Sequence, residues 1–188
     1  MRVASALVRH ELRLLASLLL WVGRRRHGVD GGRAFGYARG QGAMMLGLGF
    51  VCVVETVGMS VLLRDWPAAH QGVLVLDLHT LFIIAGLYAA TVVRPHVLSG
   101  DTLRVRNAGH LDLRIPLDRI AAVRREARYS HPPAEGALDV TVGGQTSVAV
   151  ELAEPLAHVS LLGRRREVDT VRFHADDADA LVAALRRG

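Results

Sequence analysis

The sequence lacks much of what several large classes of protein require. Its 188 residues include one cysteine, Cys52, which excludes a disulfide-stapled fold. Aromatic residues make up 5% of the chain, and all 23 basic residues are arginine, none lysine. No HExxH metal motif, glycine-rich nucleotide-binding motif or nucleophile elbow occurs. We therefore expect a protein that is not an enzyme and that holds no cofactor or metal.

The arginines are unevenly distributed along the chain. Residues 1–39 hold eight arginines against two acidic residues, whereas residues 94–188 hold 14 arginines against 13 acidic residues. A nearly neutral C-terminal half with few aromatic side chains is unlike a nucleic-acid-binding surface. Basic residues gathered beside apolar segments are typical of membrane proteins. We therefore expect anionic membrane lipids as a partner, and no nucleic acid.

Two long apolar runs, residues 43–63 and 73–93, dominate the first half of the chain. As helices, each would span about 30 Å, the thickness of the hydrocarbon core of a bilayer. Neither run has the polar stripe that a surface helix of a soluble domain shows. The short connection RDWPAAHQG between them contains Trp66 and Pro67. Residues 43–93 are thus predicted to form a transmembrane hairpin.

Arginines also flank this predicted hairpin on one side. Arg24, Arg25 and Arg26 precede the first span and Arg94 follows the second, whereas the connection holds only Arg64. This asymmetry predicts that both termini are cytoplasmic. The cluster at residues 24–26 is typical of a topology signal that contacts anionic headgroups. The alternative is a nucleotide site, but the glycine-rich stretch around the cluster contains no phosphate-binding motif.

Residues 1–42 are predicted to form an interfacial amphipathic helix followed by a glycine- and arginine-rich cytoplasmic loop. On a helical wheel one face is apolar and the opposite face is basic, as in a helix that lies among lipid headgroups. The apolar face holds Val8, Leu12, Leu15, Leu19 and Val22, and the basic face holds Arg2, Arg9 and Arg13. Glu11 falls on the apolar side and does not fit the pattern. A third membrane span is the open alternative, while no cleavage site supports a signal peptide.

Glu55 and His79 are the most conspicuous polar residues of the two spans. A charged side chain in hydrocarbon costs at least ~2.5 kcal/mol, so each should have a partner. The two residues lie at similar depths in an antiparallel hairpin, which predicts a hydrogen-bonded pair. His79 shares a helical face with Gly86 and Ala90, whose small side chains let two helices approach closely.

Three interpretations of the pair remain open. The first is a structural clamp between the two helices or between two copies of the chain. The second is a proton or ion step, because a carboxylate beside an imidazole can titrate near neutral pH in a medium of low dielectric. The third is a metal site completed by Cys52 or Asp77, although two helices supply few ligands.

From residue 94 onward the hydrophobic pattern alternates as in β-strands. Strands are predicted at residues 103–106, 110–115, 120–128, 137–142, 147–153 and 168–175. The first two form a hairpin around an Asn-Ala-Gly turn. The final residues predict a helix with Asp176 as its N-cap. Residues 94–188 therefore describe a small antiparallel β-barrel or sandwich closed by a terminal helix.

The stretch RPHVLSGDTLRVRNAGHLDLRIPLDRIAAVRRE, followed by a basic turn and a short DDADAL helix, resembles the bacterial pleckstrin-homology-like domain attached to transmembrane helices. The whole chain resembles uncharacterised two-span bacterial membrane proteins of this type. The resemblance implies the bacterial plasma membrane and a cytoplasmic domain at residues 94–188. Arg104, Arg106 and Arg114 match the basic lipid-binding motif of eukaryotic relatives only in part. They form either a solvated hairpin face or a contact with headgroups.

Two functions follow from these observations. The first is a non-enzymatic membrane protein whose pleckstrin-homology-like domain binds a protein partner or organises a complex at the cytoplasmic face. The alternative is intramembrane transport or a proton-coupled activity centred on Glu55 and His79. Two helices cannot enclose a path, so the alternative requires a homo-oligomer.

Overall fold

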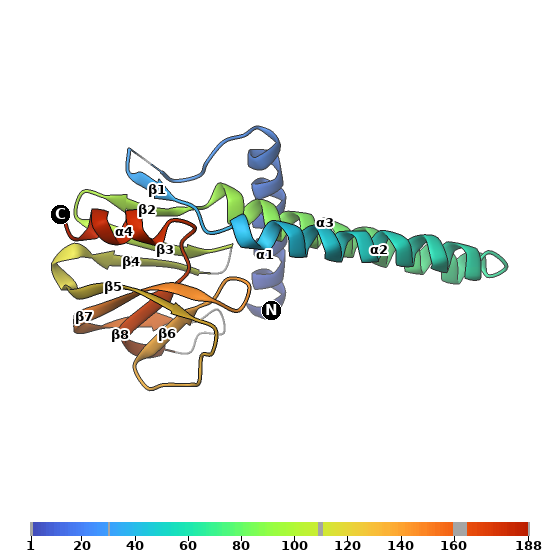
Figure 1. The fold of residues 1–188 in the computed structure, drawn as a ribbon. Helices are drawn as coiled ribbons and strands as arrows, with labels where there is room; N and C mark the ends of the chain where they lie inside the picture. Colours follow the sequence, from blue (N-terminus) through green and yellow to red (C-terminus); the bar gives the residue numbers. More distant parts are fainter. Residues whose placement is uncertain (1, 30, 109–110, 160–164, 188) are drawn as a thin grey trace.

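The computed structural model describes residues 2–29, 31–108, 111–159 and 165–187, and for residues 2–10 the backbone alone. Within these residues, four α-helices and eight strands form a helical hairpin and a domain of two four-stranded sheets. The hairpin projects from one end of the domain, and the N-terminal helix lies across the base of the hairpin (Figure 1). An α-helical part joined to a β-rich part agrees with the predicted fold class.

Helix α1, Arg2–Val22, runs transverse to the hairpin and packs on its second helix. Leu14 and Ser17 are buried in this contact, whereas the predicted apolar stripe of Leu12, Leu15, Leu19 and Val22 is exposed. The side chains of Arg2, Val8 and Arg9 lie outside the described residues. One face of α1 thus contacts the hairpin, and a separate apolar face remains uncovered.

Helices α2, Gly42–Leu62, and α3, Pro67–Val93, form the hairpin. The first span was predicted within one residue of α2 at both ends. The second begins six residues earlier than expected, and residues 63–66 alone connect the helices. Pro67 explains this difference, because proline at the first helical position loses no hydrogen bond and has a suitable φ. Both helices are long and apolar enough to cross a membrane.

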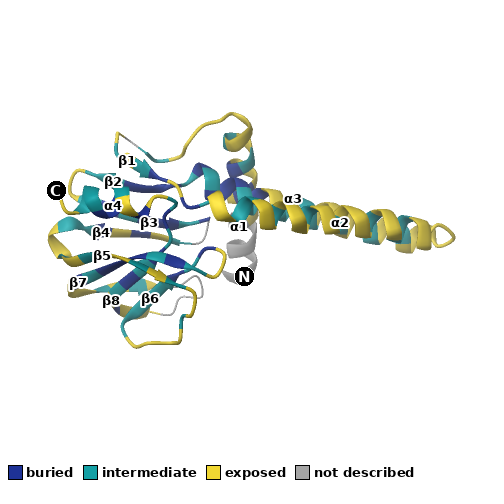
Figure 2. Ribbon diagram, in the orientation of Figure 1, coloured by how far each residue is buried: buried dark blue, intermediate teal, exposed yellow. Residues whose placement is uncertain are grey.

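The hairpin exposes its apolar side chains along most of its length (Figure 2). No residue of α2 is buried, and the buried residues of α3 are confined to its C-terminal end near the domain. On α2 the less exposed positions recur at alternating intervals of three and four residues, for example Met45, Gly49, Cys52 and Thr56. This spacing marks the seam that contacts α3.

The first sheet has the order β1-β2-β3-β4 with antiparallel neighbours. Its strands are β1 Arg33–Phe35, β2 His96–Ser99, β3 Thr102–Asn107 and β4 Leu111–Pro116. The predicted hairpin of β3 and β4 is confirmed, although turn residues 109–110 lie outside the described residues. Strands β1 and β2 were not predicted. Because β1 comes from the stretch predicted as a loop, residues 33–35 belong to the C-terminal sheet.

The second sheet has the order β5-β7-β8-β6. Its strands are β5 Ile120–Arg128, β6 Ala137–Val140, β7 Thr146–Val159 and β8 Arg165–Phe173. All four were predicted. The prediction for β5 is right at both ends, and that for β7 covers only part of the strand. The prediction for β6 is two residues too long, and that for β8 begins three residues late and ends two residues late. The prediction of a wholly antiparallel sheet was wrong, because β6 and β8 run parallel. A register shift between Glu151 and Leu156 accommodates Pro155 in the long strand β7.

One hydrophobic core joins the two sheets and helix α4, Ala178–Leu185. Leu103 and Ile115 reach it from the first sheet, and Val150 and Phe173 reach it from the second. The N-cap of α4 is Asp177, whose carboxylate accepts a hydrogen bond of 3.0 Å from the Ala180 N–H. The prediction of Asp176 was therefore off by one residue. Asp176 instead accepts a hydrogen bond from the Arg39 N–H.

Candidate functional site

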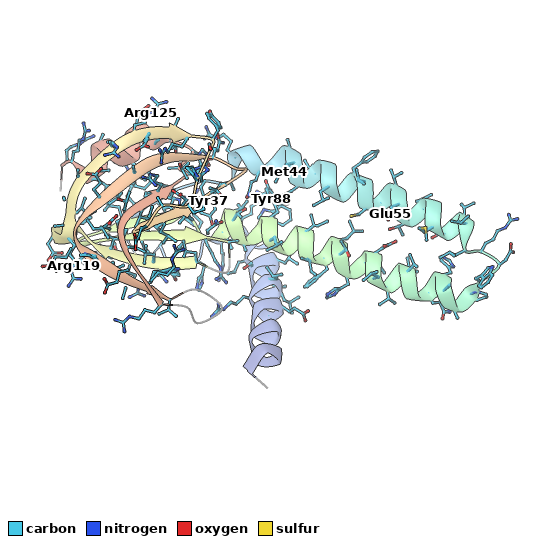
Figure 3. All side chains as sticks on the ribbon, turned by 90° about the horizontal axis from the view of Figure 1, so that it is seen from below. Tyr37, Met44, Glu55, Tyr88, Arg119 and Arg125 are labelled. Carbon is cyan, nitrogen blue, oxygen red and sulfur yellow. The ribbon has the colours of Figure 1, made fainter. Side chains whose placement is uncertain are left out.

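The predicted pair of Glu55 and His79 needs correction. His79 Nε2 lies 3.7 Å from Glu11 Oε1 on α1, and among the described residues no interaction joins His79 to Glu55. Glu55 lies midway along α2 (Figure 3), where its side chain is exposed. The His79 face of α3 contacts α1 because Gly86 on that face lets Leu14 approach closely. Glu11, which did not fit the apolar stripe, is thus the partner of His79.

Asp77, considered above as a metal ligand, is half-buried, and one of its carboxylate oxygens is buried without a hydrogen-bond partner in the described part of the chain. Cys52 is half-buried on α2 and is a free thiol. Nearer the α2–α3 connection, His70 Nε2 lies 3.1 Å from Ser60 Oγ and links the helices. No group of three or more metal-ligating side chains occurs among the described residues.

A basic pocket lies where α1, α3 and the first sheet meet. It has a volume of about 380 Å³. Arginines from three separate parts of the chain line it: Arg13 on α1, Arg94 directly after α3, and Arg106 on β3. Asp112, on β4, is the acidic residue in the lining, and His27, Ala108 and Leu111 complete the lining. We call this site the junction pocket.

Arg106 forms the fixed part of the junction pocket. It is 2% exposed, and its guanidinium donates hydrogen bonds to the carbonyl oxygens of His27 at 2.9 Å and Gly28 at 2.8 Å. It also donates a longer bond of 3.4 Å to the Pro95 carbonyl oxygen. These bonds hold the segment after α1 against the sheet. Of the two alternatives predicted for Arg106, a solvated face of the β3–β4 hairpin is wrong, because the guanidinium of Arg106 is buried under that segment.

Asp112 balances part of the charge at the pocket. Arg104 Nε donates to Asp112 Oδ1 at 2.6 Å, and Arg106 Nε lies 3.8 Å from the same oxygen. Burial acts to raise the pKa of Asp112, but the hydrogen bonds and charge of Arg104, with the charges of Arg106 and Arg114, hold it below its ordinary value. Asp112 therefore remains a carboxylate engaged by Arg104. Arg114, directly opposite Arg104 in the sheet, is exposed.

Arg94 carries an unsatisfied donor at the pocket. Its Nε is buried and has no hydrogen-bond partner in the part of the chain that the structure describes. Burial lowers the pKa of the Arg94 guanidinium, and the nearby charge of Arg13 lowers it further. Burial and then the charge of Arg104 likewise lower the pKa of Arg106. Guanidinium groups gathered in this way favour the binding of an anion.

A buried aromatic and imidazole cluster supports the pocket from the domain side. His96 is 1% exposed, accepts a hydrogen bond of 3.1 Å from the Arg106 N–H at Nδ1, and donates one of 2.8 Å to the His174 carbonyl oxygen from Nε2. Its ring stacks on Tyr37, whose hydroxyl accepts a bond from the Ala108 N–H. Burial lowers the pKa of His96 to about 4, so the ring is neutral.

Sequence reasoning placed only part of this site. Arg94 was noted as a topology signal and Arg13 as the polar face of an amphipathic helix, but nothing in their spacing indicated a shared pocket. Tyr37 and His96 gave no periodic signal, since they meet only when β1 pairs with β2. Arg24, Arg25 and Arg26 are exposed just after α1, where contact with headgroups stays a prediction.

Comparisons with known proteins identify no relative of this chain. No family model, no curated protein and no solved structure matches the chain.

Proposed function

We propose that the protein is a non-enzymatic integral membrane protein of the bacterial plasma membrane, with both termini cytoplasmic. In this proposal the α2–α3 hairpin anchors a pleckstrin-homology-like domain, which binds a protein partner or organises a complex at the inner face. The observation that carries it is the exposure of two long apolar helices next to a domain with a complete core of its own. Such a surface is stable in lipid and unfavourable in water.

The transverse helix α1 supports the same arrangement. If the hairpin crosses the bilayer, a helix perpendicular to it lies in the plane of the headgroups (Figure 1). Its uncovered apolar stripe, including Leu15 and Leu19, then contacts acyl chains. Arg24, Arg25 and Arg26, exposed beyond its C-terminal end, then lie on the side of the domain, as the positive-inside rule requires.

The attachment between the domain and the hairpin favours a fixed presentation. The His27 N–H donates a hydrogen bond of 2.8 Å to the Val93 carbonyl oxygen, and Arg106 holds His27 and Gly28 from the sheet. Two sheets with a C-terminal helix in one core are what the resemblance to pleckstrin-homology-like domains implies. A domain held in this way presents one surface to partners at the inner leaflet.

Tyr129 is the position at which we would look for that partner. Its side chain is 78% exposed just after β5, and tyrosine is enriched in protein interfaces. A photo-crosslinking residue in place of Tyr129, in the full chain in its native membrane, should give one discrete protein adduct. The same residue in place of the exposed Asp101, in the turn between β2 and β3, is the matched control. Identical adducts at both positions, or none at Tyr129, would count against the binding module.

The second candidate is the oligomeric, proton-coupled or transport activity, which the exposed Glu55 favours. A carboxylate on the outer face of a membrane hairpin needs a partner, and a second copy of the chain could supply it. The corrected pairing removes His79 from this site, because Glu11 occupies it. Proton flux in proteoliposomes should be absent for the native chain if the binding module is right. Flux that Glu55→Gln abolishes would favour the transport activity.

A further inference from the structure

We propose that the junction pocket binds a phosphate group, and that this phosphate belongs to the headgroup of an anionic phospholipid. The pocket is distinct from a basic motif on two strands, because Arg13 and Arg94 come from α1 and from the end of α3. This assignment to a lipid rests on the proposed membrane function. The affinity for phosphate itself does not.

The charge of the pocket calls for an anion. Three guanidinium groups, from Arg13, Arg94 and Arg106, line about 380 Å³, and Asp112 is already engaged by Arg104. The buried Nε of Arg94 has no hydrogen-bond partner within the described residues, which makes it a donor that a ligand would satisfy. Arginine is suited to phosphate because its planar fork of N–H donors matches two phosphate oxygens.

The position of the pocket selects a lipid as the source. Arg13 precedes Leu14, the residue of α1 that packs against Gly86 of α3, so the pocket adjoins the crossing of the two helices. If α1 lies among the headgroups, the arginines that line the pocket are within reach of the lipid phosphates. Its volume is in the range of sites for small polar ligands. A separate apolar groove of about 600 Å³ runs between the hairpin helices and Trp21, where acyl chains can lie.

Arg106 and Arg94 have different parts in this site. Arg106 is committed to three carbonyl oxygens and forms a rigid wall, so its replacement would disturb the fold. Arg94 supplies the unsatisfied donor, and Arg13 supplies charge from α1. Arg94→Gln and Arg13→Gln are therefore the informative variants. Arg64→Gln, at an exposed arginine in the α2–α3 connection, is the matched control.

The experiment measures ligand binding to the full chain in neutral detergent by native mass spectrometry. Phosphatidylglycerol, phosphatidylcholine and inorganic phosphate are added in separate arms. We expect phosphatidylglycerol to bind the native protein and Arg64→Gln equally, and Arg94→Gln at least tenfold more weakly, which corresponds to about 1.4 kcal/mol. Arg13→Gln should weaken binding in the same direction and gives a second reading if Arg94→Gln fails to fold.

Each other outcome overturns a defined part of the proposal. Arginine-dependent binding of inorganic phosphate without binding of phosphatidylglycerol would overturn the lipid as source and identify a soluble phosphorylated ligand. Equal binding of phosphatidylglycerol by the native chain, Arg94→Gln and Arg13→Gln would overturn the pocket. These binding measurements do not depend on how the chain is oriented in a membrane. A failure of the membrane proposal would therefore appear separately, in labelling experiments.

Discussion

The hairpin and the two-sheet domain place the same kinds of side chain in opposite surroundings. Phe50 on α2 is 68% exposed, whereas Phe173 on β8 is fully buried in the core. The domain surface carries ion pairs, such as Arg125 with Asp179 at 2.9 Å, while the middle of the hairpin is almost free of charge. If the hairpin crosses a membrane, as proposed, one chain satisfies two solvents, and the crossing of α1 and α3 is the boundary between them.

The largest effect on stability should come from replacing phenylalanine, which is buried in the domain and exposed on the hairpin. Phe173→Ala should destabilise the domain by about 3–5 kcal/mol, because it removes a buried ring and leaves a cavity. Phe50→Ala, the matched change on the hairpin, should shift the melting temperature in detergent little. Equal losses in the two variants would mean that the exposed hairpin face is covered by protein.

The second effect distinguishes the two regions by pH, because His96 belongs to the domain core. The pKa of His96 falls from 6.5 to about 4 on folding, so the folded protein binds fewer protons there than the unfolded chain does. The contribution of the neutral His96 ring to the free energy of unfolding is complete above pH 6.5. It is lost as the pH falls towards 4, a change of about 3 kcal/mol. Burial also lowers the pKa of His174, which adds to the loss in the same direction.

Unfolding free energies measured from pH 7 to pH 4 check this prediction. His96→Gln should be less stable at pH 7 but should show a flatter dependence on pH than the native chain. If both proteins lost stability in parallel, the titrating group would lie elsewhere.

A third change acts on the boundary itself. A Cβ added at Gly86 would lie 2.9 Å from Leu14 Cβ, so Gly86→Leu should force α1 away from α3 and cost about 1–3 kcal/mol. Gly58→Leu, where nothing lies within 4 Å, should be neutral in the same melting assay. A neutral Gly86→Leu would show that α1 does not dock on this face of α3.

The smallest of these effects concerns the cap of the terminal helix. Asp177→Ala removes the acceptor for the Ala180 N–H and should lower the stability of the domain by about 1 kcal/mol. Asp118→Ala, at an exposed aspartate elsewhere on the domain, should change stability by less. The two variants can be compared by chemical unfolding, and equal stabilities would refute the assignment of the cap.

Local patterns were sufficient to predict most elements. The alternation of residues 120–128 identified β5 with both its ends, and the apolar run at 43–63 identified α2 within one residue. The parallel pairing of β6 with β8 could not be predicted in this way, because it depends on contacts between distant segments. Strand β1 was missed for the same reason, since three residues carry no periodicity.

The sites were harder to predict than the elements. Depth along two helices gave Glu55 and His79 as partners, but the docking of a third helix decided that His79 faces Glu11. The misfit of Glu11 on the helical wheel was the available sign of this contact. The junction pocket had no such sign, because Arg13, Arg94 and Arg106 are far apart in sequence and each has an ordinary local explanation.

The central claim is that the hairpin crosses a membrane and holds the domain at its cytoplasmic face. Single cysteines at Ser130 on the domain and at Arg64 in the α2–α3 connection, each in a Cys52→Ser background, test it with a membrane-impermeant maleimide on intact cells. We predict that the cysteine at position 64 reacts from outside and that the one at position 130 reacts only after the cells are opened. Labelling of position 130 in intact cells, or recovery of the chain in the soluble fraction, would contradict the account.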